Sequence, residues 1–203
     1  MNAIEYSEIS RLAIKLKPSA ERMVKKSHPW IFADSIIKQS SSGKAGDVAV
    51  VFDTKTNKFL ACGLFDPDSP IKVKLLQFHE PKEINTWFFR AKINAAYTLR
   101  QTELYRGTDS YRLIFGENDG LPGLIADVYA DVLVLKLYSL IWLPYISEII
   151  EILAEITSSN AIVLRTSRIT KKGFEKVGLN NGQIVFGVLD SNVVLFKEIG
   201  RAS

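Results

Sequence analysis

The sequence predicts an α+β protein of two units, in which a barrel or roll of short strands is followed by helices packed on a mixed sheet. Residues 10–78 form short runs of alternating apolar and polar residues, separated by turn signals, as half-buried strands do. Beyond residue 80, apolar stripes with helical spacing are interleaved with strand-like runs. We therefore expect two domains, 1–78 and 79–203.

The first unit is expected to begin with a strand and one short helix. RLAIKL at 11–16 alternates apolar and basic residues, and Pro18 opens a helical stretch that ends before the dipeptide His28-Pro29. Further strands are predicted in the runs WIFADSIIK, GDVAVVFD, FLACGLFD and IKVKLLQF. Five or more short strands with one small helix predict a compact barrel or roll.

Two helices are expected in the second unit. Apolar residues with helical spacing predict a long helix within 82–104 whose buried stripe is Ile84, Trp87, Phe88, Ala91, Ala95 and Leu99. Pro144 is expected at the start of a second helix, over about 144–157, whose inward residues are Ile146, Ile149, Ile150 and Leu153.

The strands of the second unit are predicted around these helices. We expect them near 110–116, 123–129, 131–138 and 161–166, followed by a hairpin of 183–188 and 192–197. The segment 131–166 then has the strand–helix–strand order of a βαβ unit, without a glycine at its first turn to admit a pyrophosphate.

The composition favours a soluble globular protein. The chain has 47% hydrophobic and 24% charged residues, and its most apolar run, 132–143, is interrupted by Lys136 and too short to cross a bilayer. One cysteine, Cys62, excludes an internal disulfide, and two histidines make a metal site improbable on composition. We expect a cytoplasmic protein with no membrane partner, no signal peptide and no metal.

The positive charge of the chain is concentrated in its first part. Residues 1–79 carry 12 Lys and Arg against 8 Asp and Glu, whereas residues 80–203 carry 14 of each. Within 11–44, eight basic residues face only Glu21 and Asp34. Such a field attracts polyanions, nucleic acid first among them, although a solvated charged face is the alternative.

The loop GENDGLPGL at 116–124 could be a phosphate-binding loop, a catalytic loop or a structural turn. Its glycine spacing matches no phosphate-binding motif, whereas Asp119-Gly120 and Pro122-Gly123 are strong turn dipeptides. The loop is therefore a tight reversal that displays polar groups. Glu117 and Asp119 as paired catalytic acids remain an alternative, which would make the chain a self-contained enzyme.

One stretch resembles a known family. KPSAERMVKKSHPWIFADSI at 17–36, with GLFDPDSPIKVKLL at 63–76, is similar to the start of bacterial S-adenosylmethionine-dependent 23S rRNA 5-methylcytosine methyltransferases. GENDGLPGL followed by Asp127 and Tyr129 is similar to a motif of their central domain. The resemblance implies an N-terminal PUA-like β-barrel, a central EEHEE-type α/β domain and, in the family, a C-terminal Rossmann-like methyltransferase domain.

The chain departs from the family pattern where catalysis would begin. It stops at KEIGRAS, Cys62 is not placed to match the family's nucleophile, and Val128 stands where relatives often carry a basic residue. We therefore expect an RNA-recognition module that is inactive alone and holds no cofactor, since S-adenosylmethionine would bind the domain that is lacking. The partner expected is RNA, ribosomal by resemblance, and a homodimer or protein-interaction module is a further alternative.

The candidate RNA-binding residues form three groups. Phosphate contacts are expected from Lys15, Lys17, Arg22, Lys25 and Lys26. His28 and Trp30 are candidates for stacking on unpaired bases, although the flanking Ile31 and Phe32 favour a core position for Trp30. A second, weaker contact is expected from Arg112, Glu117, Asn118 and Asp119, and a third basic cluster, interpreted as a solvated loop, comprises Arg165, Arg168, Lys171 and Lys172.

Overall fold

The computed structural model describes residues 8–104 and 107–189, with the side chains of 102–104 left out. The described residues form two compact units, one of 8–85 with Ser139–Pro144 and one of Thr86–Tyr138 with 145–189. The first unit thus extends past residue 78, where we had predicted the domain boundary, and includes a segment from the middle of the chain.

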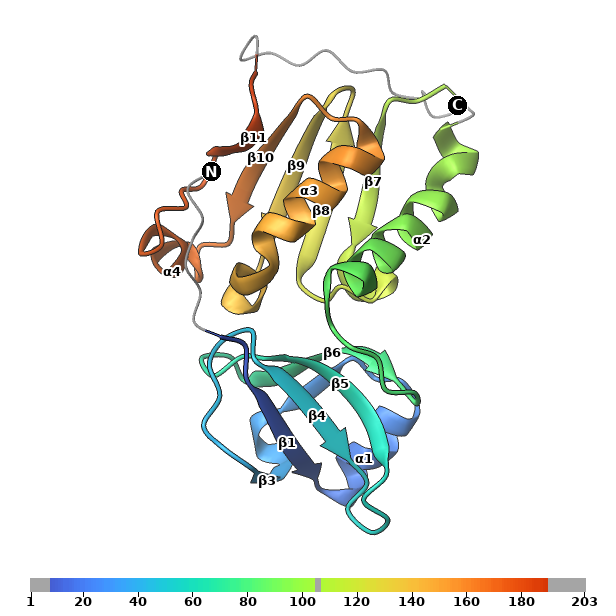
Figure 1. Cartoon of the computed structure of the whole chain (residues 1–203), viewed down its shortest axis with the longest axis vertical. Helices are drawn as coiled ribbons and strands as arrows, with labels where there is room; N and C mark the ends of the chain where they lie inside the picture. Colours follow the sequence, from blue (N-terminus) through green and yellow to red (C-terminus); the bar gives the residue numbers. More distant parts are fainter. Residues whose placement is uncertain (1–7, 105–106, 190–203) are drawn as a thin grey trace, which may run out of the picture. The chain divides into compact units, whose positions relative to one another are not determined.

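The first unit is a six-stranded sheet with one α-helix (Figure 1). Its strands stand in the order β2-β6-β5-β4-β1-β3, and β1 is parallel to β4 while the other pairs are antiparallel. The bounds along the chain are β1 (Arg11–Leu16), α1 (Pro18–Lys25), β2 (Trp30–Phe32), β3 (Ile36–Gln39), β4 (Val48–Phe52), β5 (Phe59–Phe65) and β6 (Ile71–Phe78).

The sheet is curled into a half-barrel. β2 and β3 are its two edge strands, yet only a three-residue 3-10 turn, Ala33–Ser35, joins them, so the two edges must approach each other. Leu12, Ile14 and Leu16 alternate inward along β1, and Val24 of α1 closes the core. The predicted strand WIFADSIIK is therefore two strands interrupted by a turn.

The second unit has a five-stranded sheet in the order β11-β10-β9-β8-β7. α3 connects β9 to β10, which are parallel, so the predicted βαβ unit at 131–166 is confirmed. The predicted strand at 192–197 lies outside the described residues. The bounds are α2 (Thr86–Leu104), β7 (Ser110–Phe115), β8 (Leu124–Tyr129), β9 (Val132–Leu137), α3 (Ile146–Thr157), β10 (Ala161–Thr166), α4 (Lys171–Glu175) and β11 (Ile184–Gly187).

α2 and α3 lie side by side on one face of this sheet (Figure 1). Arg90 of α2 forms a bidentate ion pair with Glu155 of α3 at 2.7–2.8 Å, and the rings of Phe89 and Tyr145 are 5.1 Å apart. The predicted inward residues of α3 are all buried. The α+β class is thereby confirmed.

In the predicted buried stripe of α2, Phe88 is confirmed as buried, but the other helix residues of the stripe are wrong in phase. The residues that face the sheet and α3 include Phe88, Phe89 and Ile93, all buried. Trp87 is 77% and Leu99 71% exposed, and Ala91 and Ala95 are exposed with them, whereas Ile84 precedes the helix. In the described residues, no helix is both long and apolar enough to span a bilayer.

Candidate nucleic-acid interface

The helix α1 presents basic residues to solvent. Its buried residues, one apolar and one acidic, face the interior of the first unit. Val24 and Glu21 are buried, and the Glu21 carboxylate accepts the backbone N–H of Thr54 at 2.6 Å. Arg22 and Lys26 are exposed on the opposite side, and neither is ion-paired with any residue that the structure describes. These two predicted site residues therefore carry charge that is free to meet a phosphate.

Lys25 differs from its neighbours because its charge is engaged. Its Nζ lies 2.7 Å from Asp53 Oδ2 and 3.8 Å from Glu21 Oε2. The hydrogen bond from Lys25, followed by those from the backbone of Thr56 and Lys55, lowers the pKa of Asp53 well below its ordinary value. Lys25 was predicted as a phosphate contact, and its position gives it a structural role in tying α1 to the turn after β4.

Lys15 lies on β1, away from α1. It is half-buried on the outward face of the strand and stands directly opposite Lys38 of β3. Like charges in directly opposed positions repel, so this pair favours a bound anion. Lys17 is exposed at the N-cap of α1, where its backbone carbonyl accepts the N–H of Glu21 at 3.0 Å. A cationic side chain at this end of the helix is unfavourable for the helix dipole.

His28, Trp30 and Phe32 form an exposed aromatic row along the edge strand β2. Trp30 is 36% and Phe32 42% exposed, while Ile31 between them is buried. The rings of His28 and Trp30 are 5.9 Å apart and those of Trp30 and Phe32 6.5 Å, each pair edge to face. The core position that the sequence favoured for Trp30 is therefore wrong, because alternation along β2 buries Ile31 instead.

The GENDGLPGL loop is a structural turn held by one carboxylate. Asp119 forms a bidentate ion pair with Arg100 at 2.7 Å to each oxygen and accepts the backbone N–H of Phe115 at 2.6 Å. Its side chain is only 5% exposed. Asp119 is thus removed from contact with RNA and from acid catalysis, which leaves the paired-acid alternative without one of its members. Glu117 and Asn118 are exposed on the same turn.

Arg112, the last of the predicted residues, lies on β7 with its guanidinium exposed. Asp127 on the neighbouring strand accepts its Nε–H at 2.7 Å and its Nη2–H at 3.2 Å, which raises the pKa of the arginine. The guanidinium carbon also lies 5.0 Å from the ring centre of Phe115, a side chain that is 48% exposed. Arg112 therefore belongs to a cation–aromatic pair on the sheet.

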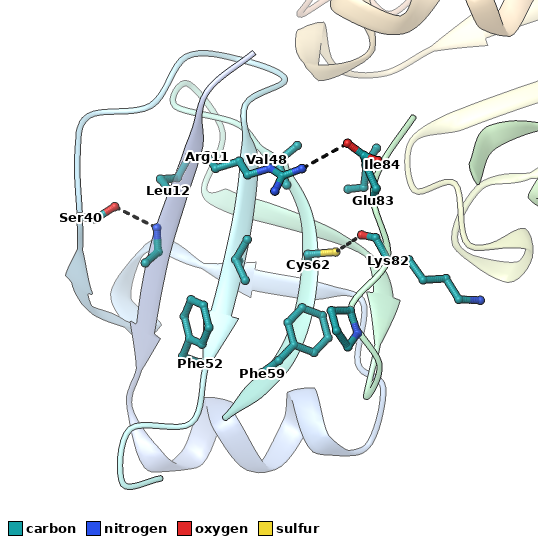
Figure 2. A pocket seen from close by; sticks show the side chains of 13 residues that line it. Arg11, Leu12, Ser40, Val48, Phe52, Phe59, Cys62, Lys82, Glu83 and Ile84 are labelled. Carbon is teal, nitrogen blue, oxygen red and sulfur yellow. Dashed lines mark hydrogen bonds and ion pairs between the residues drawn. The ribbon is translucent and has the colours of Figure 1, made fainter. Parts of the chain in front are cut away.

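A cavity of about 770 Å³ opens on the outer face of the first unit's sheet (Figure 2). Its floor is apolar, with Val48, Phe52, Phe59 and Cys62 among its members, and residues 81–84 pass along one side. Arg11 and Glu83 form an ion pair of 3.5 Å at its rim. None of the predicted RNA-binding residues lines this cavity, and its described lining holds no acid–base pair suited to catalysis.

Comparison with known proteins shows what the chain is similar to. Residues 14–78, which make up most of the first unit, match the model of the PUA-like domain family. The chain as a whole is similar in sequence to ribosomal RNA large subunit methyltransferases. It is 36% identical, over 96% of its own length, to the ribosomal RNA large subunit methyltransferase of Deinococcus radiodurans, of which it covers 48%.

A second relative is similar in sequence, and a solved structure is similar in fold. Over 62% of its length the chain is 40% identical to ribosomal RNA large subunit methyltransferase I of Shewanella denitrificans, of which it covers 32%. A candidate SAM-dependent methyltransferase from Streptococcus mutans shares its fold with a TM-score of 0.71 and 13% identity, over 88% of this chain and 44% of that one. The chain spans about half the length of the Deinococcus radiodurans relative.

Proposed function

We propose that this chain recognises RNA, and ribosomal RNA in particular, through the face formed by α1 and β2. The observation that carries the proposal is the exposed row His28–Trp30–Phe32, which directly follows a helix with two unpaired cations. Its relatives are named as ribosomal RNA methyltransferases, and residues 14–78 match the PUA-like domain family.

The chemistry of this face fits unpaired RNA. Arg22 and Lys26 supply charge for phosphates, whose neutralisation releases counterions and provides sequence-independent affinity. The half-exposed rings of Trp30 and Phe32 offer surfaces on which unstacked bases can lie. Lys17 adds a third exposed cation at the start of the helix.

The methyl-transfer chemistry of the relatives is a separate part of the proposal. By resemblance, the relatives would make 5-methylcytosine in large-subunit RNA with S-adenosylmethionine as the methyl donor. We expect this chain alone to show no heat of binding with S-adenosylmethionine in a calorimetric titration, and to bind RNA under the same conditions.

The test of the RNA-binding face is an anisotropy titration with single-stranded fragments of large-subunit ribosomal RNA. Arg22→Glu with Lys26→Glu should weaken binding at least tenfold and lower the slope of log affinity against log salt by about 1.4, because two phosphate contacts are lost. Trp30→Ala should weaken binding by about tenfold, the loss expected for one stacked base.

Matched controls separate this face from general charge and aromaticity. Lys171→Glu with Lys172→Glu makes the same change of charge on α4, and Trp87→Ala removes a tryptophan that is 77% exposed on α2. Both should bind RNA with unchanged affinity. Equal losses in the site variants and in their controls would show that α1 and β2 form no specific face.

A further inference from the structure

The second unit leaves one face of its sheet uncovered by α2 and α3 (Figure 1). The register places Phe115, Ile125, Lys136 and Arg165 side by side across β7, β8, β9 and β10. Residues directly opposite one another point to the same face of a sheet, and these four are exposed or half-buried, so they lie on the uncovered face.

Two cation–aromatic pairs stand on this face. Arg112 lies over Phe115 at 5.0 Å, and the Nζ of Lys136 lies 4.8 Å from the ring centre of Tyr138. Phe115 is 48% and Tyr138 44% exposed, although both are large aromatic side chains that proteins normally bury. Exposed rings beside cations form the surface that single-stranded nucleic acid uses, with bases on the rings and phosphates on the cations.

Two cations of this face, Lys136 and Arg165, have no carboxylate partner among the described residues. Lys136 and Arg165 are register neighbours on the parallel strands β9 and β10, where like charges repel. Asp127 lies in the adjacent row, where it is already bound by both Nε and Nη2 of Arg112. Within residues 8–104 and 107–189, no carboxylate forms an ion pair with Lys136 or Arg165. An arriving polyanion would relieve this repulsion.

We propose that the uncovered sheet face is a second RNA-contact surface, which holds a single-stranded segment with bases against Phe115 and Tyr138 and phosphates on Lys136 and Arg165. The inference rests on the proposed function, since it takes RNA as the ligand of the chain. Single-stranded RNA is favoured over an acidic protein segment because the two rings would find no partner in a run of carboxylates. The sequence predicts an RNA contact on this face only at Arg112, and it places Arg165 in a solvated basic loop.

The test is photocrosslinking of the whole chain to a single-stranded RNA of large-subunit sequence that contains 4-thiouridine, followed by peptide mapping. Crosslinks are expected both at Trp30 and Phe32 and at Phe115 and Tyr138. Crosslinks at the first pair alone would overturn this inference and leave the proposed function standing. Crosslinks at the second pair alone would support the inference and overturn the role of α1 and β2, and crosslinks at neither would overturn both.

Variants make the test quantitative. Lys136→Glu with Arg165→Glu, and separately Tyr138→Ala, should each weaken binding of the same RNA about tenfold, whereas Tyr138→Phe keeps the ring and should stay within twofold of the parent. Equal far-UV circular dichroism and melting midpoints exclude misfolding. If Tyr138→Ala leaves RNA affinity unchanged while Lys136→Glu with Arg165→Glu abolishes binding of poly-glutamate, the surface binds acidic protein and the proposal fails.

Discussion

Lys25 illustrates how one side chain in a basic cluster can belong to the fold. It ends a helix whose other exposed cations are unpaired, yet its ammonium lies 2.7 Å from Asp53. The same carboxylate accepts the backbone N–H groups of Lys55 and Thr56 and thereby orders the turn after β4. The charge of Lys25 therefore stabilises the contact between α1 and the turn after β4, and it is already neutralised by Asp53.

The pair formed by Lys25 and Asp53 predicts a pH dependence of stability. Because the pKa of Asp53 is lowered in the folded state, the pair stabilises the fold above the ordinary aspartate pKa of about 3.9, and this contribution is lost as the pH falls further. In Lys25→Met the largest cause of the shift is removed. We expect the free energy of unfolding, measured by urea denaturation, to fall less steeply below pH 4 in this variant than in the parent.

A matched control checks that the slope comes from the ion pair. Lys55 is an exposed lysine of the same turn, and no described carboxylate pairs with it. Lys55→Met should keep the acid slope of the parent chain. Identical slopes in Lys25→Met and the parent would mean that Asp53 owes its low pKa to the backbone N–H groups alone.

At the scale of elements, the sequence predicted the strands well and the faces of some elements poorly. Strict alternation in β1 predicted its bounds because that strand buries one face. β6 was predicted with its observed bounds as well, although its four central residues are all buried. α2 carries two apolar stripes with helical spacing, and periodicity alone does not tell which of them meets the sheet. Edge strand β2 has only three residues, and all three are apolar, so the sequence does not show which of them is buried. The pairing of β2 with β6 in the fold decides that Trp30 is exposed.

The candidate site was predictable only in part for a similar reason. The basic composition of α1 is visible in the sequence, but the carboxylate that engages Lys25 comes from residue 53. Asp119 appeared as a displayed acid, whereas its partner Arg100 lies on α2. On the uncovered sheet face, only Arg112 was predicted as an RNA contact. The face as a whole joins side chains from four strands, and only strand order brings them together.

The exposed stripe of α2 predicts self-association. Trp87 and Leu99 flank the small side chains of Ala91 and Ala95, a pattern that lets two helices approach closely, and such large apolar groups are rarely left together in solvent. We expect a monomer–dimer equilibrium in light scattering at micromolar concentration. Trp87→Ser with Leu99→Ser should shift it to monomer, whereas exposed Ile169→Ser should not. A parent chain that stays monomeric would contradict the homodimer prediction.

At the scale of the whole molecule, the chain path makes the first unit discontinuous. Ser139–Pro144, which follows β9, is part of this unit by its contacts. The Ser139 hydroxyl donates to Asp66 Oδ2 at 2.6 Å, and the same buried oxygen is 2.8 Å from Lys74 Nζ. Gly46, with a φ of +92°, lies so close that a Cβ there would stand 2.6 Å from Pro144 Cγ. Residues far apart in sequence thus complete one core.

This arrangement predicts that a residue at position 139 controls the unfolding of a unit built mainly from residues 8–85. Ser139→Ala removes a donor from a buried carboxylate and should cost the first unit about 1–2 kcal/mol, and Gly46→Ala should cost more because it combines a clash with an unfavourable φ. Cys62 is the single cysteine of the chain and is buried in this unit, so its rate of thiol labelling against urea concentration reports when the unit opens. The labelling midpoint should fall in both variants and stay unchanged in Ser147→Ala, an exposed serine of α3. Unchanged midpoints in all three variants would mean that the segment 139–144 contributes nothing to the first unit, and that residues 8–85 hold their fold alone.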